Sequence, residues 1–333
     1  MNSINYPYTV GWAITNKCNL QCSHCNMNSG AALADELSMS EIKPIIDDLA
    51  RHSVHNICFT GGEPLLRSDF FDIANYALSK GVRVCVTTNG TLVTRSLIEK
   101  ELYKFDIVRI SLDGRDEKSN SFIRQSESAY FKAVDAIRML CEDGCNTMVS
   151  TCVSQKNIDQ LDDMALLLAK LGVKRWTMPL FFPAGRGVKI ADVALSPMQV
   201  RDFIIKVSKF YDRYGIFVSF DYPYAIAIPA NELPRRNFLC GSCAAGITQL
   251  MIFANGNVSP CFAISESCGN LRTNSISDIW NKNEMFKAFR DKSLIQGKCG
   301  KCTFLNQCGG GCRAVPFIQD GNYLGEDTVC WLK

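Results

Sequence analysis

The stretch CNLQCSHC (residues 18–25) places Cys18, Cys22 and Cys25 in the spacing CX3CX2C. It closely follows YTVGWAIT (residues 8–15), a run rich in β-branched and aromatic residues that is typical of a strand. Three thiolates from one loop can bind three irons of a 4Fe–4S cube and leave the fourth iron without a protein ligand. The alternatives are a partial zinc knuckle or three unrelated buried thiols, and the tightness of the loop behind a strand disfavours both.

The rest of the composition favours a metal site in a reducing compartment. The 333 residues include 17 cysteines but only three histidines, His24, His52 and His55, so a zinc site with several histidine ligands is nearly excluded. The N-terminus has no basic segment followed by an apolar one, and no segment approaches about 18 uninterrupted apolar residues. We therefore expect a cytoplasmic protein without a membrane segment, in which cysteines bind metal rather than form disulfides.

The charge balance bears on the partners of the protein. The 36 basic and 33 acidic residues give a net charge of +3, and they form no run of like charges. Proteins that bind nucleic acid usually carry a clustered basic excess, so we expect no nucleic-acid partner.

Beyond the cysteine loop, strand-like and helix-like segments alternate. The strand-like segments are residues 8–15, 56–60, 83–89, 107–114, 146–154 and 174–182, and the helix-like segments are residues 40–51, 71–81, 130–144 and 158–172. Gly81, Gly144 and Gly172 follow helical periods and are typical of helix C-termini. Regular alternation predicts right-handed βαβ units around a parallel sheet. We expect an α/β fold, a partial (β/α)6 TIM-like barrel with its site at the C-terminal strand ends.

The pattern changes after the sixth predicted strand. FFPAGRG (residues 181–187) is a Gly/Pro break, and residues 196–216 have the periodicity of an amphipathic helix. After about residue 235 the chain is poor in regular apolar patterning, so it needs cross-links of some kind to hold it together. We expect three parts: a partial barrel (1–187), a helical linker region (188–234) and a small Cys-rich domain (235–333).

Two motifs together resemble the radical S-adenosylmethionine (SAM) superfamily. The CX3CX2C loop follows the first predicted strand, and GGEP (Gly61–Pro64) follows the second. The resemblance covers residues 8 to about 185 and implies that Cys18, Cys22 and Cys25 bind a 4Fe–4S cluster whose open iron is chelated by SAM. In that family, reductive cleavage of SAM yields a 5′-deoxyadenosyl radical that abstracts hydrogen from the substrate.

The resemblance also carries a set of SAM-binding residues over to this chain. Glycines let the backbone approach a ligand closely, and Glu63 adjoins carbonyls that can accept from the SAM ammonium. Arg124 matches a position near the SAM carboxylate, with a surface arginine as the alternative, and Asn157 matches only weakly. His24 is expected to stack or pack beside the adenine rather than bind metal. The full set is His24, Gly61, Gly62, Glu63, Thr88, Asn89, Ser111, Asp113 and Arg124.

A second group of cysteines resembles the SPASM domain, an auxiliary iron–sulfur module of radical SAM enzymes. Its signature is CGKCTFLNQCGGGC (residues 299–312), spaced CX2CX5CX3C, with CGSC (240–243) and NGNVSPC (255–261) before it and Cys330 after it. The resemblance runs from about residue 235 to 333 and implies two further 4Fe–4S clusters with crossed ligand sets. The first set is Cys240, Cys243, Cys261 and Cys312, and the second is Cys299, Cys302, Cys308 and Cys330.

Several points stay open in this cysteine-rich chain. Two structural zinc sites, each with four cysteine ligands, would have similar spacing. Either Cys240 or Cys268 could complete the first auxiliary set. The other cysteines lie in strand-like runs or near a helix end, where packing in the core is the simpler interpretation: Cys58, Cys85, Cys141, Cys145 and Cys152.

The resemblance implies a radical SAM oxidoreductase with three 4Fe–4S clusters, SAM and a reducing partner such as flavodoxin or ferredoxin. One class of substrate is a ribosomally made peptide or protein, changed by crosslinking, oxidation or epimerisation at a side-chain or backbone carbon. Because the chain begins almost at its first strand, such a peptide maturase could use a separate peptide-recognition protein. The other class is a tetrapyrrole of the haem pathway, oxidised or decarboxylated, or another small molecule, since FFPAGRG resembles a segment of those enzymes. A structural iron–sulfur or zinc protein is the non-enzymatic alternative.

Overall fold

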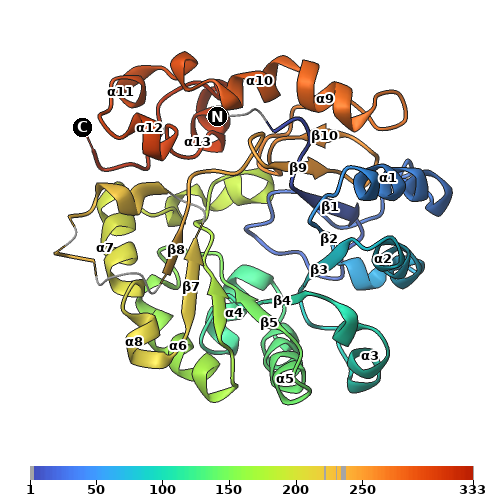
Figure 1. Ribbon diagram of the computed structural model, residues 1–333. Coiled ribbons are helices and arrows are strands. Elements are labelled where there is room, and N and C mark those ends of the chain that lie inside the picture. Colours follow the sequence, from blue (N-terminus) through green and yellow to red (C-terminus); the bar gives the residue numbers. More distant parts are fainter. Residues whose placement is uncertain (1–3, 221–222, 230, 234–237, 333) are drawn as a thin grey trace.

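The structure is a computed structural model that describes residues 4–220, 223–229, 231–233 and 238–332, without the side chains of residues 239 and 240. The expected domain boundary at residues 234–235 lies outside the described residues. Figure 1 shows a curved sheet with helices around its outside, and the C-terminal helices gathered above one edge of it.

The described residues form a ten-stranded sheet in the order β10-β9-β1-β2-β3-β4-β5-β6-β7-β8. Neighbouring strands from β1 to β8 are parallel, so their carboxyl ends meet at one edge of the sheet. Their bounds are β1 (Thr9–Thr15), β2 (Asn56–Gly61), β3 (Arg83–Thr88), β4 (Ile107–Ser111), β5 (Thr147–Ser150), β6 (Arg175–Thr177), β7 (Phe217–Phe220) and β8 (Phe238–Cys240). The predicted α/β partial barrel is confirmed.

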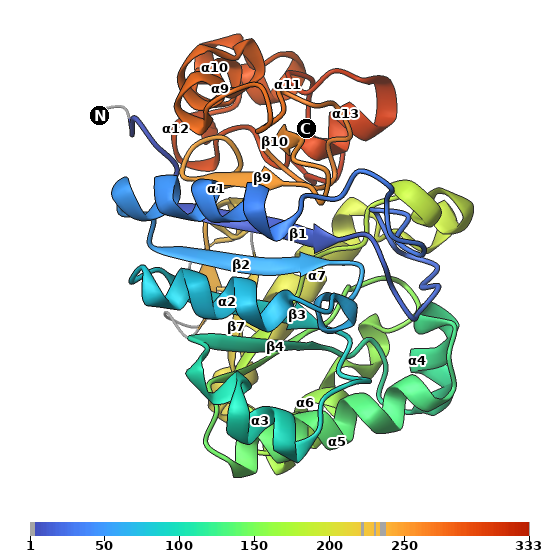
Figure 2. The same ribbon diagram turned by 90° about the vertical axis from the view of Figure 1, so that its right-hand side faces the viewer.

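Helices cover the outer face of the parallel sheet (Figure 2). They are α1 (Met39–Arg51), α2 (Phe70–Ser79), α3 (Arg95–Lys100), α4 (Glu117–Arg124), α5 (Ser128–Glu142), α6 (Leu161–Lys170), α7 (Pro197–Val207) and α8 (Phe210–Tyr214). Alternation along each strand explains this layering. In β2, Ile57 and Phe59 are fully buried beneath helices, whereas Cys58 and Thr60 are half-buried on the concave side. The concave side is thus left for the site.

Local sequence explains where these helices begin and end. Gly81, Gly144 and Gly172 lie one residue beyond the C-caps of α2, α5 and α6 and have left-handed φ angles of 78°, 72° and 86°. At the start of α1, the Glu41 carboxylate accepts the Ser38 N–H at 2.8 Å. The positions of the three glycines agree with the expectation from sequence.

Residues 188–234 contain more than a helical linker. The helix expected over residues 196–216 is divided into α7 and α8, and β7 follows it and pairs in parallel with β6. The four residues of β7 are too few to give a clear periodic signal, which explains why the sequence pattern did not reveal the strand. The expected boundary at residue 187 therefore falls within a sheet that continues to β8.

The C-terminal part begins by adding strands to the barrel. β9 (Gln249–Ile252) pairs in parallel with β1, and β10 (Val258–Ser259) pairs antiparallel with β9. Short helices follow: α9 (Ile276–Lys282), α10 (Glu284–Arg290), α11 (Gly297–Gly300), α12 (Leu305–Cys308) and α13 (Ala314–Asp320). No helix in the described part of the chain is long and apolar enough to cross a membrane.

The GGEP segment after β2 supports the start of the cysteine loop. The N–H groups of Gly62 and Glu63 donate to the carbonyls of Thr15 and Lys17, each at 2.8 Å. A Cβ atom on Gly62 would lie 2.1 Å from the Lys17 oxygen, so no side chain fits at this position. The glycine is required because two backbone segments pack directly against each other.

Gly62→Ala should destabilise the protein by about 3 kcal/mol, because the backbone it would strike cannot yield as a side chain can. Gly81→Ala is the matched control. A Cβ atom there meets nothing within 4 Å, so only the left-handed backbone is penalised, by about 1 kcal/mol. Anaerobic thermal unfolding should show a clearly larger fall in Tm for Gly62→Ala, and equal falls would contradict the packing argument.

Candidate functional site

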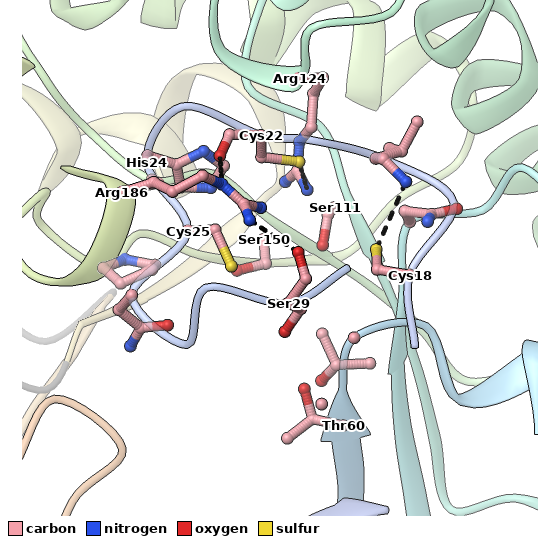
Figure 3. Close-up of a pocket in the computed structure, with 18 of the residues that line it drawn as sticks. Cys18, Cys22, His24, Cys25, Ser29, Thr60, Ser111, Arg124, Ser150 and Arg186 are labelled. Carbon is pink, nitrogen blue, oxygen red and sulfur yellow. Dashed lines mark hydrogen bonds between the residues drawn. The ribbon is translucent and has the colours of Figure 1, made fainter. Parts of the chain in front are cut away.

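A cavity of about 300 Å³ opens at the carboxyl ends of the parallel strands. The hydroxyl-bearing residues Thr60, Ser111 and Ser150 line it from the ends of β2, β4 and β5. Figure 3 shows Cys18, Cys22 and Cys25 around the same space. The expected site residues in its lining are Cys18, Cys22, Cys25, His24, Gly61, Gly62, Thr88, Asn89, Ser111 and Arg124.

The cysteine loop is closed on itself and held by one carboxylate. The Cys18 N–H donates to the Gly30 carbonyl at 2.8 Å and so joins the two ends of the loop. The Glu36 carboxylate accepts the Thr15 hydroxyl at 2.9 Å and the Asn16 N–H at 2.7 Å. These bonds satisfy backbone and side-chain groups where β1 gives way to the loop.

Arg186, which was not among the expected site residues, holds the loop from the other side. Its backbone N–H donates to the Cys25 carbonyl and its Nε to the Cys22 carbonyl, both at 2.9 Å. Its Nη1 donates to the Ser29 carbonyl at 2.7 Å (Figure 3). Gly185 before it has a φ of 56° and no room for a Cβ atom. The Gly-Arg pair within FFPAGRG was the signal available in the sequence.

Arg124 lies in the cavity wall because Asp113 holds it there. Its Nε is 2.6 Å from Oδ2 of the fully buried Asp113, and its Nη1 is 3.9 Å from the Cys22 sulfur. Burial alone would lower the pKa of Arg124, but Asp113 and Cys22 raise it overall, so the guanidinium stays charged. The surface alternative for Arg124 is therefore wrong.

Asp113 and Asn157 act inside the protein rather than in the cavity lining. Asp113 Oδ1 accepts the Cys152 N–H at 2.8 Å. The expectation was that this carboxylate would line the cavity, but only its partner Arg124 does so. The Asn157 Nδ2 donates to the carbonyls of Asp113 and Cys152 at 2.9 Å. Both side chains thus join the ends of β4 and β5.

His24 contributes a largely buried, neutral ring to the same wall. Burial lowers the pKa of His24 to about 4. Its Nε2 is 3.8 Å from the Asp113 carboxylate, and its Nδ1 is buried without a well-formed hydrogen bond. The buried Ser29 hydroxyl in this lining is also unsatisfied. Unsatisfied polar atoms beside a cavity fit a bound group that supplies the missing partners.

Glu63 is committed to the protein interior, in contrast to its expected contact with SAM. It is fully buried, and its Oε1 accepts the Thr88 hydroxyl at 2.7 Å while its Oε2 accepts the Asn89 N–H at 2.8 Å. The carboxylate therefore joins the end of β2 to the end of β3. The backbone of Gly61 and Gly62, which lines the cavity, is the part of this motif that a ligand can reach.

Four cysteines of the C-terminal part surround a second, smaller cavity. Tyr224 and Asp327 share this lining with them. The four are Cys299, Cys302, Cys308 and Cys330, the second of the two expected auxiliary sets.

Cys243, Cys261 and Cys312 form a separate group. They pack against one small apolar cluster that includes Ile264. Burial raises the pKa of Cys312 well above its usual value, and Cys243 raises it further, as does Cys261. Cys312 thus groups with cysteines far away in sequence rather than with its neighbour Cys308, which is the arrangement that crossed ligand sets require.

The other cysteines divide by location. Cys240 ends β8, and its side chain lies outside the described residues. Cys268 packs against the same apolar cluster as the group above, so both candidates for a fourth ligand remain open. Cys58 and Cys85 are direct neighbours across β2 and β3. Cys152 lines the main cavity, which its interpretation as a core residue did not anticipate.

Several of the expected ligand sulfurs accept a backbone N–H group, as thiolates at iron–sulfur clusters do. These bonds join Leu20 to Cys18 at 3.5 Å, Ala263 to Cys261 at 3.4 Å, Asp327 to Cys299 at 3.4 Å and Gly311 to Cys308 at 3.2 Å. Burial nevertheless raises the pKa of Cys18 to about 11 and that of Cys22 as well. The thiolate forms need a nearby cation, and an iron cluster supplies one.

Comparison with known proteins gives matches at both regions. The model of the radical SAM superfamily matches residues 12–177, and that of SPASM, an iron–sulfur cluster-binding domain, matches residues 243–303. The mycofactocin maturase MftC of Mycolicibacterium smegmatis is 32% identical over 98% of this chain and 83% of its own length. An AdoMet-dependent heme synthase of Nitratidesulfovibrio vulgaris is 28% identical over 97% of this chain and 92% of its own length.

Solved structures agree in fold. SuiB of Streptococcus suis, bound to S-adenosylmethionine, aligns with a TM-score of 0.81 over 99% of this chain and 79% of its own, at 18% identity. The native anSMEcpe with bound AdoMet aligns with a TM-score of 0.71 over 95% of this chain and 91% of its own, also at 18% identity. Together with the relative that matches nearly the whole length at 32% identity, these findings show that the chain belongs to the radical SAM superfamily and carries a C-terminal iron–sulfur cluster-binding SPASM domain.

Proposed function

We propose that this protein is a cytoplasmic radical SAM enzyme that crosslinks, oxidises or epimerises a ribosomally made peptide at a side-chain or backbone carbon. Cys18, Cys22 and Cys25 hold the cluster that binds SAM. The cluster and SAM together supply the carbon radical that abstracts hydrogen from the substrate. The remaining residues of the site hold the loop and shape the space in which SAM and substrate meet. The engagement of both charged lining side chains with the protein itself is the observation that carries the proposed substrate class.

Both charged side chains in the described lining of the cavity are already engaged with the protein. Arg124 pairs with Asp113, and Arg186 binds the carbonyls of Cys22 and Ser29. The other described lining residues are polar but uncharged or apolar. A tetrapyrrole of the haem pathway carries several carboxylates, whose burial requires paired cations. A peptide main chain is neutral and can bond to hydroxyls and amides.

A mainly apolar groove of about 260 Å³ lies beside the cavity. Leu180, Phe181 and Phe182 line both spaces. Val200 of α7 and Val315 of the SPASM domain add to the far wall of the groove. The described residues that line the groove carry no charge, so it suits an apolar amino-acid side chain beside the residue that is modified.

The relatives support the peptide substrate class and also support a second candidate class, the tetrapyrroles. MftC, at 32% identity, is named as a maturase. The AdoMet-dependent heme synthase, at 28% identity over nearly the whole chain, favours oxidation or decarboxylation of a tetrapyrrole as the alternative. The two classes differ in the charge that the substrate brings into the cavity.

We further propose that the chain binds three 4Fe–4S clusters. Cys240, Cys243, Cys261 and Cys312 hold the first auxiliary cluster, and Cys299, Cys302, Cys308 and Cys330 hold the second. The grouping of Cys312 with Cys243 and Cys261, and the cavity shared by the other set, support this assignment. With four thiolates each, neither set leaves an open iron for SAM. A flavodoxin or ferredoxin is the proposed reductant, and a separate recognition protein is the proposed carrier of the peptide.

Anaerobically reconstituted protein should contain about 12 iron and 12 sulfide per chain, four of each from every cluster. A variant with Cys18, Cys22 and Cys25 all changed to Ala should lose about four of each, because only the SAM-binding cluster loses its ligands. Elemental analysis and colorimetric sulfide determination measure both numbers. Zinc in place of most of the iron would contradict the proposal of two auxiliary iron–sulfur clusters.

Arg186→Ala should lower SAM cleavage by dithionite-reduced protein about 10–100-fold, because the cysteine loop loses two side-chain hydrogen bonds that orient its thiolates. Arg186→Lys should recover only part of this activity, since an ammonium cannot reproduce the fork of donors. Arg213→Ala is the control, an exposed arginine of α8 paired with Asp162. Release of 5′-deoxyadenosine is the readout, and normal cleavage by Arg186→Ala would refute the anchoring role.

The substrate class can be tested directly. The reconstituted enzyme, SAM and a reductant are incubated with short peptides encoded beside its gene, with and without any neighbouring recognition protein, or with an iron porphyrin that carries propionates. Mass spectrometry in normal and deuterated water should show a changed peptide and an unchanged porphyrin. A changed porphyrin with every peptide intact would favour the tetrapyrrole alternative.

A further inference from the structure

Asp327 contacts both groups of auxiliary cysteines and is a proposed ligand in neither. Its side chain is fully buried. Its Oδ2 accepts the Cys312 N–H at 2.7 Å, and its own N–H donates to the Cys299 sulfur at 3.4 Å. Cys312 belongs to one proposed ligand set and Cys299 to the other, so one residue connects the two sites.

Two further hydrogen bonds fix the Asp327 carboxylate. The Tyr224 hydroxyl donates to its Oδ2, and the Val329 N–H donates to its Oδ1 at 2.9 Å. Tyr224 lies in the segment between β7 and β8, so Asp327 also ties the SPASM domain to the barrel. Because these partners all donate, the position calls for a side chain with two accepting oxygens.

The packing around Asp327 excludes side chains of similar chemistry. Gly311 has a φ of 75°, and a Cβ atom there would lie 2.2 Å from the Asp327 Oδ2. The carboxylate therefore occupies the space that this glycine leaves. A glutamate would be one methylene too long for that space, and an asparagine would turn its amide N–H groups toward one of the donors.

We propose that Asp327 is a positioning residue that sets the geometry of both auxiliary clusters at once. Its carboxylate holds the backbone of Cys312 in place for one cluster, and the bonds to that carboxylate fix the Asp327 N–H that donates to the Cys299 thiolate of the other. The two sites therefore share one positioning residue, and that residue is anchored to the barrel through Tyr224. This inference rests on the proposed function in taking these cysteines as cluster ligands.

Asp327→Asn, reconstituted beside the wild-type protein, tests the proposal. Iron should fall from about 12 to about 4 per chain, with loss of the electron paramagnetic resonance signals of both auxiliary clusters. SAM cleavage should stay within about twofold of wild type, since the SAM-binding cluster in the barrel keeps its ligands. Cys308→Ala, which removes a ligand from one set, should lose only about four irons.

Asp320→Asn is the matched control for Asp327→Asn. Asp320 also accepts a backbone N–H, from Asn322 at 2.9 Å, but it lies at the exposed end of α13. This variant should keep all its iron. Circular dichroism and size-exclusion chromatography establish that each variant is folded.

Tyr224→Phe provides a second measurement should Asp327→Asn not fold. It removes one donor and leaves the carboxylate, so iron should leave the auxiliary sites for a chelator about tenfold faster than in wild type. A folded Asp327→Asn with full iron and unchanged spectra, or with iron lost from one site alone, would overturn the proposal, as would unchanged release from Tyr224→Phe. Wild-type protein with only about four irons would instead reject the proposed auxiliary clusters.

Discussion

The cysteine loop depends on hydrogen-bond donors from elsewhere in the chain, because a loop at the end of a parallel sheet has no ladder to satisfy its own carbonyls. Arg186 supplies donors from the segment after β6, and the backbone of Gly62 and Glu63 supplies them after β2. The segments that follow β2 and β6, two strands that are not neighbours in the sheet, thus hold the cysteine loop from two sides. The loop that carries the three cysteines thus keeps its place outside the strands and helices, and it forms part of the cavity wall.

The sequence predicted the features that rest on neighbouring residues. Helical and strand periods located β1 to β6 and the longer helices between them, and Gly81, Gly144 and Gly172 ended helices where their spacing indicated. The spacing of the cysteines identified both iron–sulfur regions, which the family models confirm. Hydrophobic periodicity, helix-ending glycines and cysteine spacing are local signals, and the fold agrees with each of them.

What the sequence did not predict is determined by contacts over long range. β7, β9 and β10 have four, four and two residues and are defined by their pairing with distant strands. Asp327 is a single polar residue outside the helices and strands, where no pattern distinguishes it from a surface residue, and Arg186 had only the Gly-Arg pair within FFPAGRG as a signal. For Glu63 the sequence indicated a role that the fold does not give it. Its motif suggested contact with a ligand, but Thr88 and Asn89 donate to its two carboxylate oxygens.

The parallel pairing of β9 with β1 has a consequence for the synthesis of the chain. β1 leaves the ribosome well before β9, so one of its edges has no partner until the C-terminal part has been made. In that interval an apolar strand edge and the reactive thiols of the following loop are exposed together, which favours association with other nascent chains. Pairing over so long a separation also closes slowly. The protein is therefore most vulnerable to aggregation and thiol oxidation while it is being translated, before its first strand has met its ninth.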